Sequence, residues 1–216
     1  EAIISGPSFT LLSEPMIRNF MDYCLQEKLK IQVLSVHILY HSDSTFSDVE
    51  QQLSRLYDDY IISPEYSTVG VTELHVNEYG APKQYGRPGS MLALLRIMER
   101  SGVAQAMRAE WGQSQAFTDD MHGYMVFLGS ADPVEDVETN NGAMQDLLTP
   151  DLRPRGIWWA YKYYADGADS RVQASSNLEY IMPIASHASG RRNYHQLLLA
   201  SYDADSIIER PETIGI

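Results

Sequence analysis

The first part of the chain alternates short apolar runs with longer segments in which apolar side chains recur at helical spacing. The helical segments are residues 14–28, about 46–62 and 90–101. The strand-like runs are residues 2–5, 31–40, 69–80 and 103–111. Pro64 follows the second helical segment and Gly102 follows the third, as expected where helices end. This order of strands and helices predicts βα units and a parallel sheet.

The pattern changes in the last part of the chain. A helix is expected over 156–166, after a long polar stretch at about 113–141. From Ser170 on, apolar and polar residues alternate with period two, which predicts antiparallel strands at 171–176, 179–186 and 194–203. We therefore expect an α/β domain over residues 1–168 and a small β-rich accessory segment over 169–216.

Composition narrows the possible functions. Of the 216 residues, 44% are hydrophobic, which suffices for one large domain or for one domain and part of a second. The 29 acidic residues outnumber the 16 basic ones and give a net charge of −13. Such a chain repels phosphate backbones and anionic lipids, so nucleic-acid and membrane partners are disfavoured. The compartment and the oligomeric state stay open, and secretion is compatible with the sequence.

Cysteine and histidine positions argue against a metal or a cofactor. Cys24 is the only cysteine and lies at an apolar position of the first helix, so a buried core residue is expected and no intrachain disulfide can form. His37 and His41 fall in a strand and the loop after it, where their spacing does not bring two rings to one metal ion. Motifs for phosphate, dinucleotide or zinc binding are missing. We predict neither a metal nor a cofactor.

Polar and aromatic side chains gather where the expected strands end. They are Gly6-Pro7-Ser8, His37 with Tyr40, Glu78 with Tyr79, and Glu110 with Trp111. The carboxyl ends of parallel strands meet at one edge of a sheet, where catalytic groups of α/β enzymes collect. A carboxylate, an imidazole, a phenol and an indole at that edge suit the cleavage of sugars. The carboxylate stabilises an oxocarbenium-like centre, and the indole stacks on a sugar ring.

Each of these residues also has an ordinary structural interpretation. Glu78 also fits a solvated charge leaving its strand, His37 a core histidine, and Trp111 a cap on the core. Their occurrence at successive strand ends favours a shared site. The aromatic residues of 156–166 lie at helical spacing, and we expect them in the core.

Four motifs occur along the chain in the order IISGPSF, VLSVHILY, HVNEYG and MRAEWG. In this order they resemble the fifth to eighth barrel strands of the retaining (β/α)8 glycoside hydrolases of clan A, especially the branch near family 39. The run LLTPDLRPRGIWWAYKYYADG is similar to the last helix region of these enzymes, after which a β-rich domain follows. The resemblance implies an α/β fold, the C-terminal half of a TIM barrel followed by a small antiparallel β unit.

The same resemblance implies a retaining glycosidase that acts on an oligo- or polysaccharide without a cofactor. Glu78 corresponds to the nucleophile, and the residues that correspond to sugar-binding groups are His37, Tyr40, Tyr79 and Trp111. The acid/base carboxylate of this family ends the fourth strand, whereas this chain begins near the fifth. We therefore expect a fragment that lacks the acid/base. The alternative is a non-catalytic carbohydrate-binding or structural half-barrel.

Glu73 is a rival for the role of nucleophile. Thr72-Glu73 resembles the strand ending of other clan members, and a strand that stopped there would make Glu73 the nucleophile. In a regular strand the period of two places Glu73 and Glu78 on opposite faces, so both cannot point into the barrel. We prefer Glu78, because apolar residues continue the strand beyond Glu73 and a Tyr-Gly turn follows Glu78.

Overall fold

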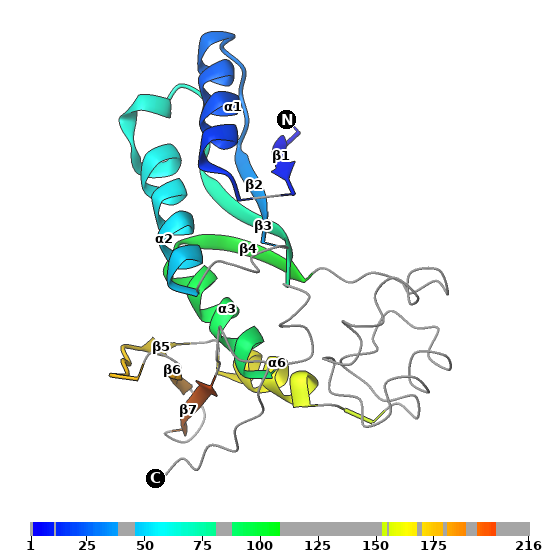
Figure 1. Cartoon of the computed structure of the whole chain (residues 1–216), viewed down its shortest axis with the longest axis vertical. Coiled ribbons are helices and arrows are strands. Elements are labelled where there is room, and N and C mark those ends of the chain that lie inside the picture. The colour runs from blue at the N-terminus through cyan, green and yellow to red at the C-terminus, as the bar shows by residue number, and fades with distance from the viewer. Residues whose placement is uncertain are drawn as a thin grey trace.

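A parallel and an antiparallel sheet, joined by helices, make up the structure, a computed structural model (Figure 1). It describes residues 2–10, 12–38, 46–80, 88–108, 153–154, 156–167, 170–178, 181–188 and 194–201. The parallel strands are β1 (Ser5–Phe9), β2 (Val33–Ile38), β3 (Glu73–Tyr79) and β4 (Val103–Arg108). The antiparallel strands are β5 (Arg171–Val172), β6 (Ile181–Ala188) and β7 (Tyr194–Ser201). The helices are α1 (Glu14–Gln26), α2 (Phe46–Tyr57) with its π-helical continuation (Asp58–Ile62), a 3₁₀ turn (Pro64–Tyr66), α3 (Pro88–Arg100) and α6 (Gly156–Asp166).

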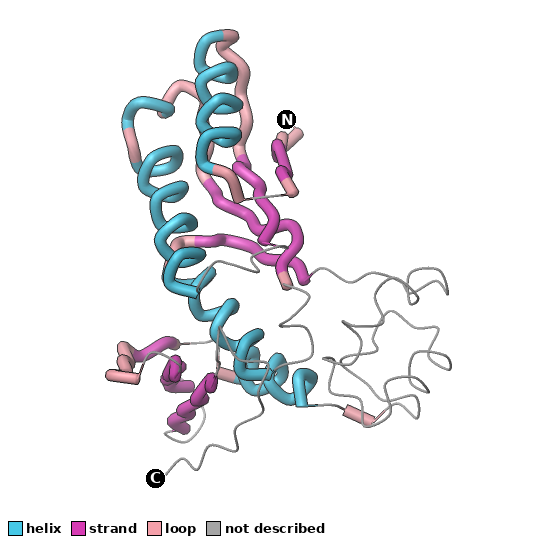
Figure 2. The backbone as a smooth tube through the Cα atoms, viewed as in Figure 1, coloured by secondary structure: helices cyan, strands magenta, loops and turns pink. Residues whose placement is uncertain are grey.

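The parallel sheet has the strand order β1-β2-β3-β4, so each strand pairs with its neighbours along the chain. The connecting helices α1, α2 and α3 lie on one side of it (Figure 2). The parallel α/β sheet that the sequence pattern predicts is confirmed. The finer expectation, that these strands are half of a (β/α)8 barrel, stays a prediction, and so does the domain boundary at residue 168.

Three of the parallel strands begin later than the sequence pattern indicates, and the second of them, expected from residue 31, begins at Val33. The first is expected over 2–5, yet β1 begins at Ser5 and continues through the cis Gly6–Pro7 bond. Proline lacks an amide donor, and Pro7 lies on the outermost of the four described parallel strands. The third begins at Glu73 instead of residue 69, because Gly70 has a φ of 88° and interrupts the extended backbone.

The main core lies between the parallel sheet and its helices. Alternate residues of β2 and β3 face the helices and are fully buried, among them Leu34, Val36, Leu74 and Val76. The helices contribute their apolar stripes, which include Ile17, Met21, Cys24, Leu53 and Leu56. Cys24 is a buried, free thiol, as the sequence predicts.

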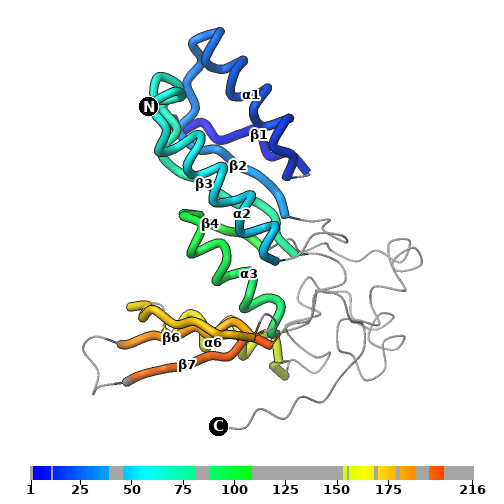
Figure 3. Tube along the Cα trace, turned by 60° about the vertical axis from the view of Figure 1, so that its left-hand side comes forward, coloured from blue at the N-terminus to red at the C-terminus, as the bar shows by residue number. Residues whose placement is uncertain are grey.

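The antiparallel sheet packs one of its faces against the same helical layer (Figure 3). Ile184 of β6 and Ala200 of β7 are fully buried there. The period-two pattern thus predicts the strands correctly, except that the expected strand at 171–176 is much shorter. Only Arg171 and Val172 pair with β6.

Arg171 ties the antiparallel sheet to two helices. Its Nε donates to Glu99 of α3 at 3.1 Å, and its guanidinium lies 4.3 Å from the ring centre of Tyr164 of α6. Tyr164 completes the triangle, because its hydroxyl donates to Glu99 at 2.8 Å. The three side chains come from three elements, so the cluster fixes the position of β5 on the helices.

The aromatic residues of α6 divide between partly buried and exposed positions, and Tyr161 and Tyr164 are the ones that pack against the core. The buried residues of this helix are Ile157 and Ala160. Trp159 and Tyr163 are exposed, and their rings stack with a centroid distance of 5.8 Å. The sequence-based expectation of a core position is wrong for these two, because a helix that packs against the core on one side leaves its opposite side in solvent.

Tyrosine burial predicts a loss of stability at alkaline pH. Burial is the main cause that raises the pKa of Tyr60 to about 12, and burial with the hydrogen bond to Glu99 raises that of Tyr164 to about 12, from an ordinary 10.0. A group with a raised pKa in the folded state contributes stability that is complete below pH 10.0 and is lost as the pH rises through about 12. Urea unfolding across this window should show the decrease. A smaller decrease is expected for Tyr164→Phe, and an equal one would contradict the assignment.

Candidate functional site

The side of the parallel sheet that faces away from the helices carries most of the sequence-predicted polar residues. Paired residues of parallel strands point to the same side of a sheet, and Leu34 and Leu74 pair on the helix side. Along each strand, the residues that alternate with these helix-side residues point to the other side of the sheet, which we call the polar face. It includes Ser35 and His37 of β2, Glu73, His75 and Glu78 of β3, and Gln105 of β4.

A β-bulge in β3 decides the direction of Glu78. Val76 and Glu78 pair with consecutive residues of β2, the second of which is His37, so Asn77 is one extra residue in β3. The extra residue shifts the alternation, and Glu78 lies on the polar face together with Glu73. The sequence-based expectation that the two carboxylates take opposite faces is wrong, because it assumes a regular strand.

Glu78 and His37 are neighbours at the carboxyl ends of β3 and β2. The distance from His37 Nδ1 to Glu78 Oε2 is 3.7 Å, longer than a hydrogen bond. The Glu78 side chain is 39% exposed and the His37 side chain 14%, so the carboxylate is open to solvent while the ring is held in place. In the described part of the chain, His37 Nδ1 is buried without a hydrogen-bond partner. The pair therefore presents an accessible carboxylate next to an unsatisfied imidazole nitrogen.

Glu73 lies on the polar face at the other end of β3. It is the first residue of that strand, and its carboxylate is 2.7 Å from Nε2 of His75. The rival assignment of the nucleophile requires a strand that stops at Glu73, and this condition is not met. The side chain is 46% exposed.

Tyr79 does not join the polar face. It pairs with Ile38 on the helix side and is buried, and its hydroxyl lies 3.0 Å from that of Tyr161. Burial raises the pKa of Tyr79, although the contact with Tyr161 and the charge of Arg108 partly oppose this. The sequence-based assignment of Tyr79 to the sugar site is therefore corrected: the bulge that brings Glu78 to the polar face turns the next residue toward the helices.

The other two predicted sugar-binding residues, Tyr40 and Trp111, lie outside the described residues. Their roles stay predictions. Among the predicted site residues that are described, the structure brings together Glu78 and His37, and it places Glu73 and Tyr79 elsewhere.

The structure adds three polar residues next to this pair that sequence reasoning did not assign a role. Asn77 donates from Nδ2 to Ser8 Oγ at 2.8 Å, and Ser8 Oγ lies 2.7 Å from Ser35 Oγ. Ser35 is fully buried. The sequence gives a signal for Ser35, which stands inside the apolar run VLSVHI. A serine buried at such a position needs a hydrogen-bond partner.

Neither a membrane-spanning helix nor a metal site is found among the described residues. None of the described helices is long and apolar enough to span a membrane. No group of three or more histidine, cysteine or acidic side chains that suits a metal ion occurs in the same part of the chain.

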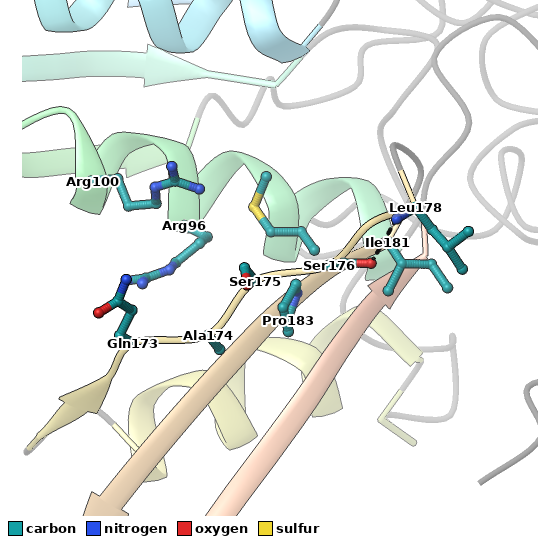
Figure 4. Close-up of a pocket in the computed structure, with 10 residues that line it drawn as sticks. Arg96, Arg100, Gln173, Ala174, Ser175, Ser176, Leu178, Ile181 and Pro183 are labelled. Atoms are coloured by element: carbon teal, nitrogen blue, oxygen red, sulfur yellow. Dashed lines mark hydrogen bonds between the residues drawn. The ribbon is translucent and has the colours of Figure 1, made fainter.

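A groove of about 470 Å³ lies away from the polar face, between α3 and the segment that leads from β5 into β6 (Figure 4). Arg96 and Arg100 extend into it from α3. Both are engaged by carboxylates, since Arg96 lies 3.4 Å from Glu99 and Arg100 lies 3.1 Å from Glu50. The groove contains none of the predicted site residues, and its paired arginines do not mark a separate site.

Solved structures resemble this fold. A protein of Neocallimastix frontalis aligns with a TM-score of 0.61 and 22% identity over 91% of this chain and 42% of its own. A glucosidase from Croceicoccus marinus aligns with a TM-score of 0.56 and 14% identity over 87% of this chain and 37% of its own. The chain thus spans about two fifths of the structures it matches, and at these identities the likeness concerns the fold alone. No protein-family model and no curated protein matches the sequence.

Proposed function

We propose that this chain is part of a retaining glycoside hydrolase and supplies its nucleophile, Glu78. One observation carries the proposal: a bulge at the carboxyl end of β3 turns the Glu78 carboxylate onto the polar face, 3.7 Å from His37. This is the end of a parallel sheet at which α/β enzymes collect their catalytic groups. The likeness to a glucosidase fold supports the same reaction class by analogy.

In the proposed reaction the ionised Glu78 carboxylate attacks the anomeric carbon of the sugar. The bond from that carbon to the leaving oxygen breaks, and a glycosyl ester of Glu78 forms. Water then cleaves the ester, and the sugar leaves with its original anomeric configuration. The partial exposure of Glu78 supports this role, because the attacking oxygen must be free of protein partners and reachable by a substrate.

His37 is the proposed group that holds the sugar beside Glu78. Its Nδ1 is buried and has no hydrogen-bond partner in the described segments, and such an atom costs free energy until a partner arrives. A sugar hydroxyl placed between the ring and Glu78 would satisfy it. Tyr40 and Trp111 remain proposed sugar contacts from the neighbouring strand ends.

The proposed reaction also needs an acid/base carboxylate. On the described strands, the carboxylates are Glu73 and Glu78. Along β3, at 3.3 Å per residue, they are roughly 13 Å or more apart, whereas the two carboxylates of a retaining enzyme are about 5 Å apart. We therefore place the acid/base outside the described residues.

The proposed substrate is an uncharged oligo- or polysaccharide. A net charge of −13 disfavours anionic sugars through long-range repulsion. A carboxylate and an imidazole suit the hydroxyl groups of such a sugar. A hydroxyl donates a hydrogen bond to a carboxylate, and it can donate to or accept from an imidazole nitrogen.

Covalent trapping tests this proposal. The whole protein that contains this chain would be incubated with a panel of activated aryl fluoroglycosides, whose fluorine slows hydrolysis of the glycosyl ester more than its formation. Peptide mass spectrometry is expected to find the sugar on Glu78. A label on another carboxylate would overturn the nucleophile assignment. Sugar binding without any covalent label across the panel would favour the non-catalytic alternative.

A further inference from the structure

β2 lies between two strands that each contain a β-bulge, β1 and β3. In β1, Pro7 and Phe9 pair with the consecutive residues Ser35 and Val36, so Ser8 is one extra residue. In β3 the extra residue is Asn77, as described above. Each bulge changes the face taken by the residue that follows it. In β1 the change sends Phe9 toward α1, and in β3 it sends Glu78 to the polar face.

The two extra residues are bonded to each other. β1 and β3 are not neighbours in the sheet, yet Asn77 Nδ2 donates to Ser8 Oγ at 2.8 Å across β2. Beneath this bond, Ser8 Oγ lies 2.7 Å from the buried Ser35 Oγ of β2. A hydroxyl has one proton and two lone pairs, so Ser8 accepts from Asn77 and still shares a bond with Ser35. Three adjacent strands are thus connected through one serine oxygen.

We infer that Ser8, Ser35 and Asn77 are positioning residues that hold the bulge of β3 and thereby direct Glu78 toward the substrate. The inference rests on the proposed nucleophilic role of Glu78. We call the three residues the bulge brace. None of them needs to touch the sugar for this role, because they act on the backbone that carries Glu78.

The bulge of β3 needs such a brace because it interrupts the regular alternation of side chains along the strand. An extra residue in a strand loses its ladder pairing, so a bulge persists when other contacts stabilise it. Asn77 obtains such a contact from Ser8, whose φ of 56° is in the left-handed region that residues with a side chain seldom adopt. Without the brace, the carboxylate of Glu78 is no longer held next to His37.

Ser8→Gly is the most direct test of the bulge brace. It removes the hydroxyl, and with it both bonds of the brace, while glycine accepts the left-handed backbone that Ser8 has. The backbone of the variant is therefore unstrained, and the cost of leaving the buried Ser35 hydroxyl without this partner is measured by thermal unfolding. Asn77→Ala is the second variant, because it removes the bond between the strands from the other side and leaves the Ser8 backbone unchanged.

The matched control is Ser54→Ala. Ser54 Oγ donates to Ser101 Oγ at 3.3 Å, so the variant also removes a serine–serine hydrogen bond, but in α2 and away from the polar face. We expect wild-type rates for it. Thermal unfolding of all variants reports whether the fold is kept.

The first readout is the trapping rate of Glu78 in the whole protein. Ser8→Gly and Asn77→Ala are expected to lower kcat and the trapping rate on the order of 100-fold with little change in KM, the effect of a reacting group displaced by about 1 Å. A purely structural role would lower the unfolding temperature and leave the rate of the folded protein unchanged. Wild-type trapping in both folded variants overturns the inference.

The second readout does not depend on activity. The ring nitrogens of His37 are observed by NMR, and Glu78→Gln is expected to change their chemical shifts because the two groups are 3.7 Å apart. In the Ser8→Gly or Asn77→Ala background this change should disappear, and its persistence overturns the brace. If the wild-type protein traps no sugar, the proposed function fails, and this NMR comparison still decides whether the brace holds Glu78.

Discussion

Replacement of Glu78 by glutamine abolishes the glycosidase activity that we propose, with an expected loss of kcat on the order of 10⁴- to 10⁶-fold. Glutamine has the shape of glutamate but neither its negative charge nor a nucleophilic oxygen, so the glycosyl ester cannot form. The side chain is partly exposed, and its contact with His37 is a long one, at 3.7 Å. The fold should therefore be unaffected. Steady-state hydrolysis of an aryl glycoside by the whole protein measures the loss.

Glu73→Gln is the matched control for this experiment. It makes the same chemical change on the same strand and the same face, at a side chain of similar exposure. Its place at the start of β3 puts it far from the proposed reaction, so nearly wild-type hydrolysis is expected. If Glu73→Gln were inactive and Glu78→Gln active, the nucleophile would be Glu73.

The second large effect concerns stability. Leu34 lies on β2 and is fully buried between the sheet and its helices. Leu34→Ala removes buried apolar groups and leaves a cavity, which costs about 2–5 kcal/mol of the free energy of unfolding. A domain has about 5–15 kcal/mol in total, so the variant loses a large part of its stability. Denaturant unfolding at neutral pH measures the difference.

Leu197→Ala is the control for the stability experiment. Leu197 is also a leucine in a strand, but it lies on the outer face of the antiparallel sheet and is 59% exposed. Its replacement should change the free energy of unfolding by no more than about 0.5 kcal/mol. Equal losses in the two variants would show that the core does not lie between the parallel sheet and α1–α3.

The fold could be predicted to a large extent because burial leaves a local pattern. Each helix shows its apolar stripe within one segment of sequence, and each strand shows its apolar run. The boundaries were less predictable where a single backbone feature intervened. Gly70 shortens β3 with a φ of 88°, and β1 begins only at Ser5 and runs through Pro7.

The candidate site was predictable only in part. Glu78 and His37 were found because both stand near the ends of successive strands, and parallel strands bring their ends together. The same reasoning assigned Tyr79 to the site, whereas it packs against Tyr161 on the helix side. Ser8 and Asn77 received no role, because nothing within either segment indicates that the two side chains meet.

The alternation of short strands and amphipathic helices was enough to specify a parallel sheet with helices on one side, since each element buries its own apolar residues. It also placed a carboxylate and an imidazole at neighbouring strand ends. Only the pairing of the strands in the tertiary structure decides on which face of the sheet Glu78 lies. The bulge exists only in the register of β3 against its neighbouring strands, and its extra residue bonds to Ser8, 69 positions earlier in the chain. A periodic pattern read along one strand contains neither contact, which is why it placed Glu73 and Glu78 on opposite faces.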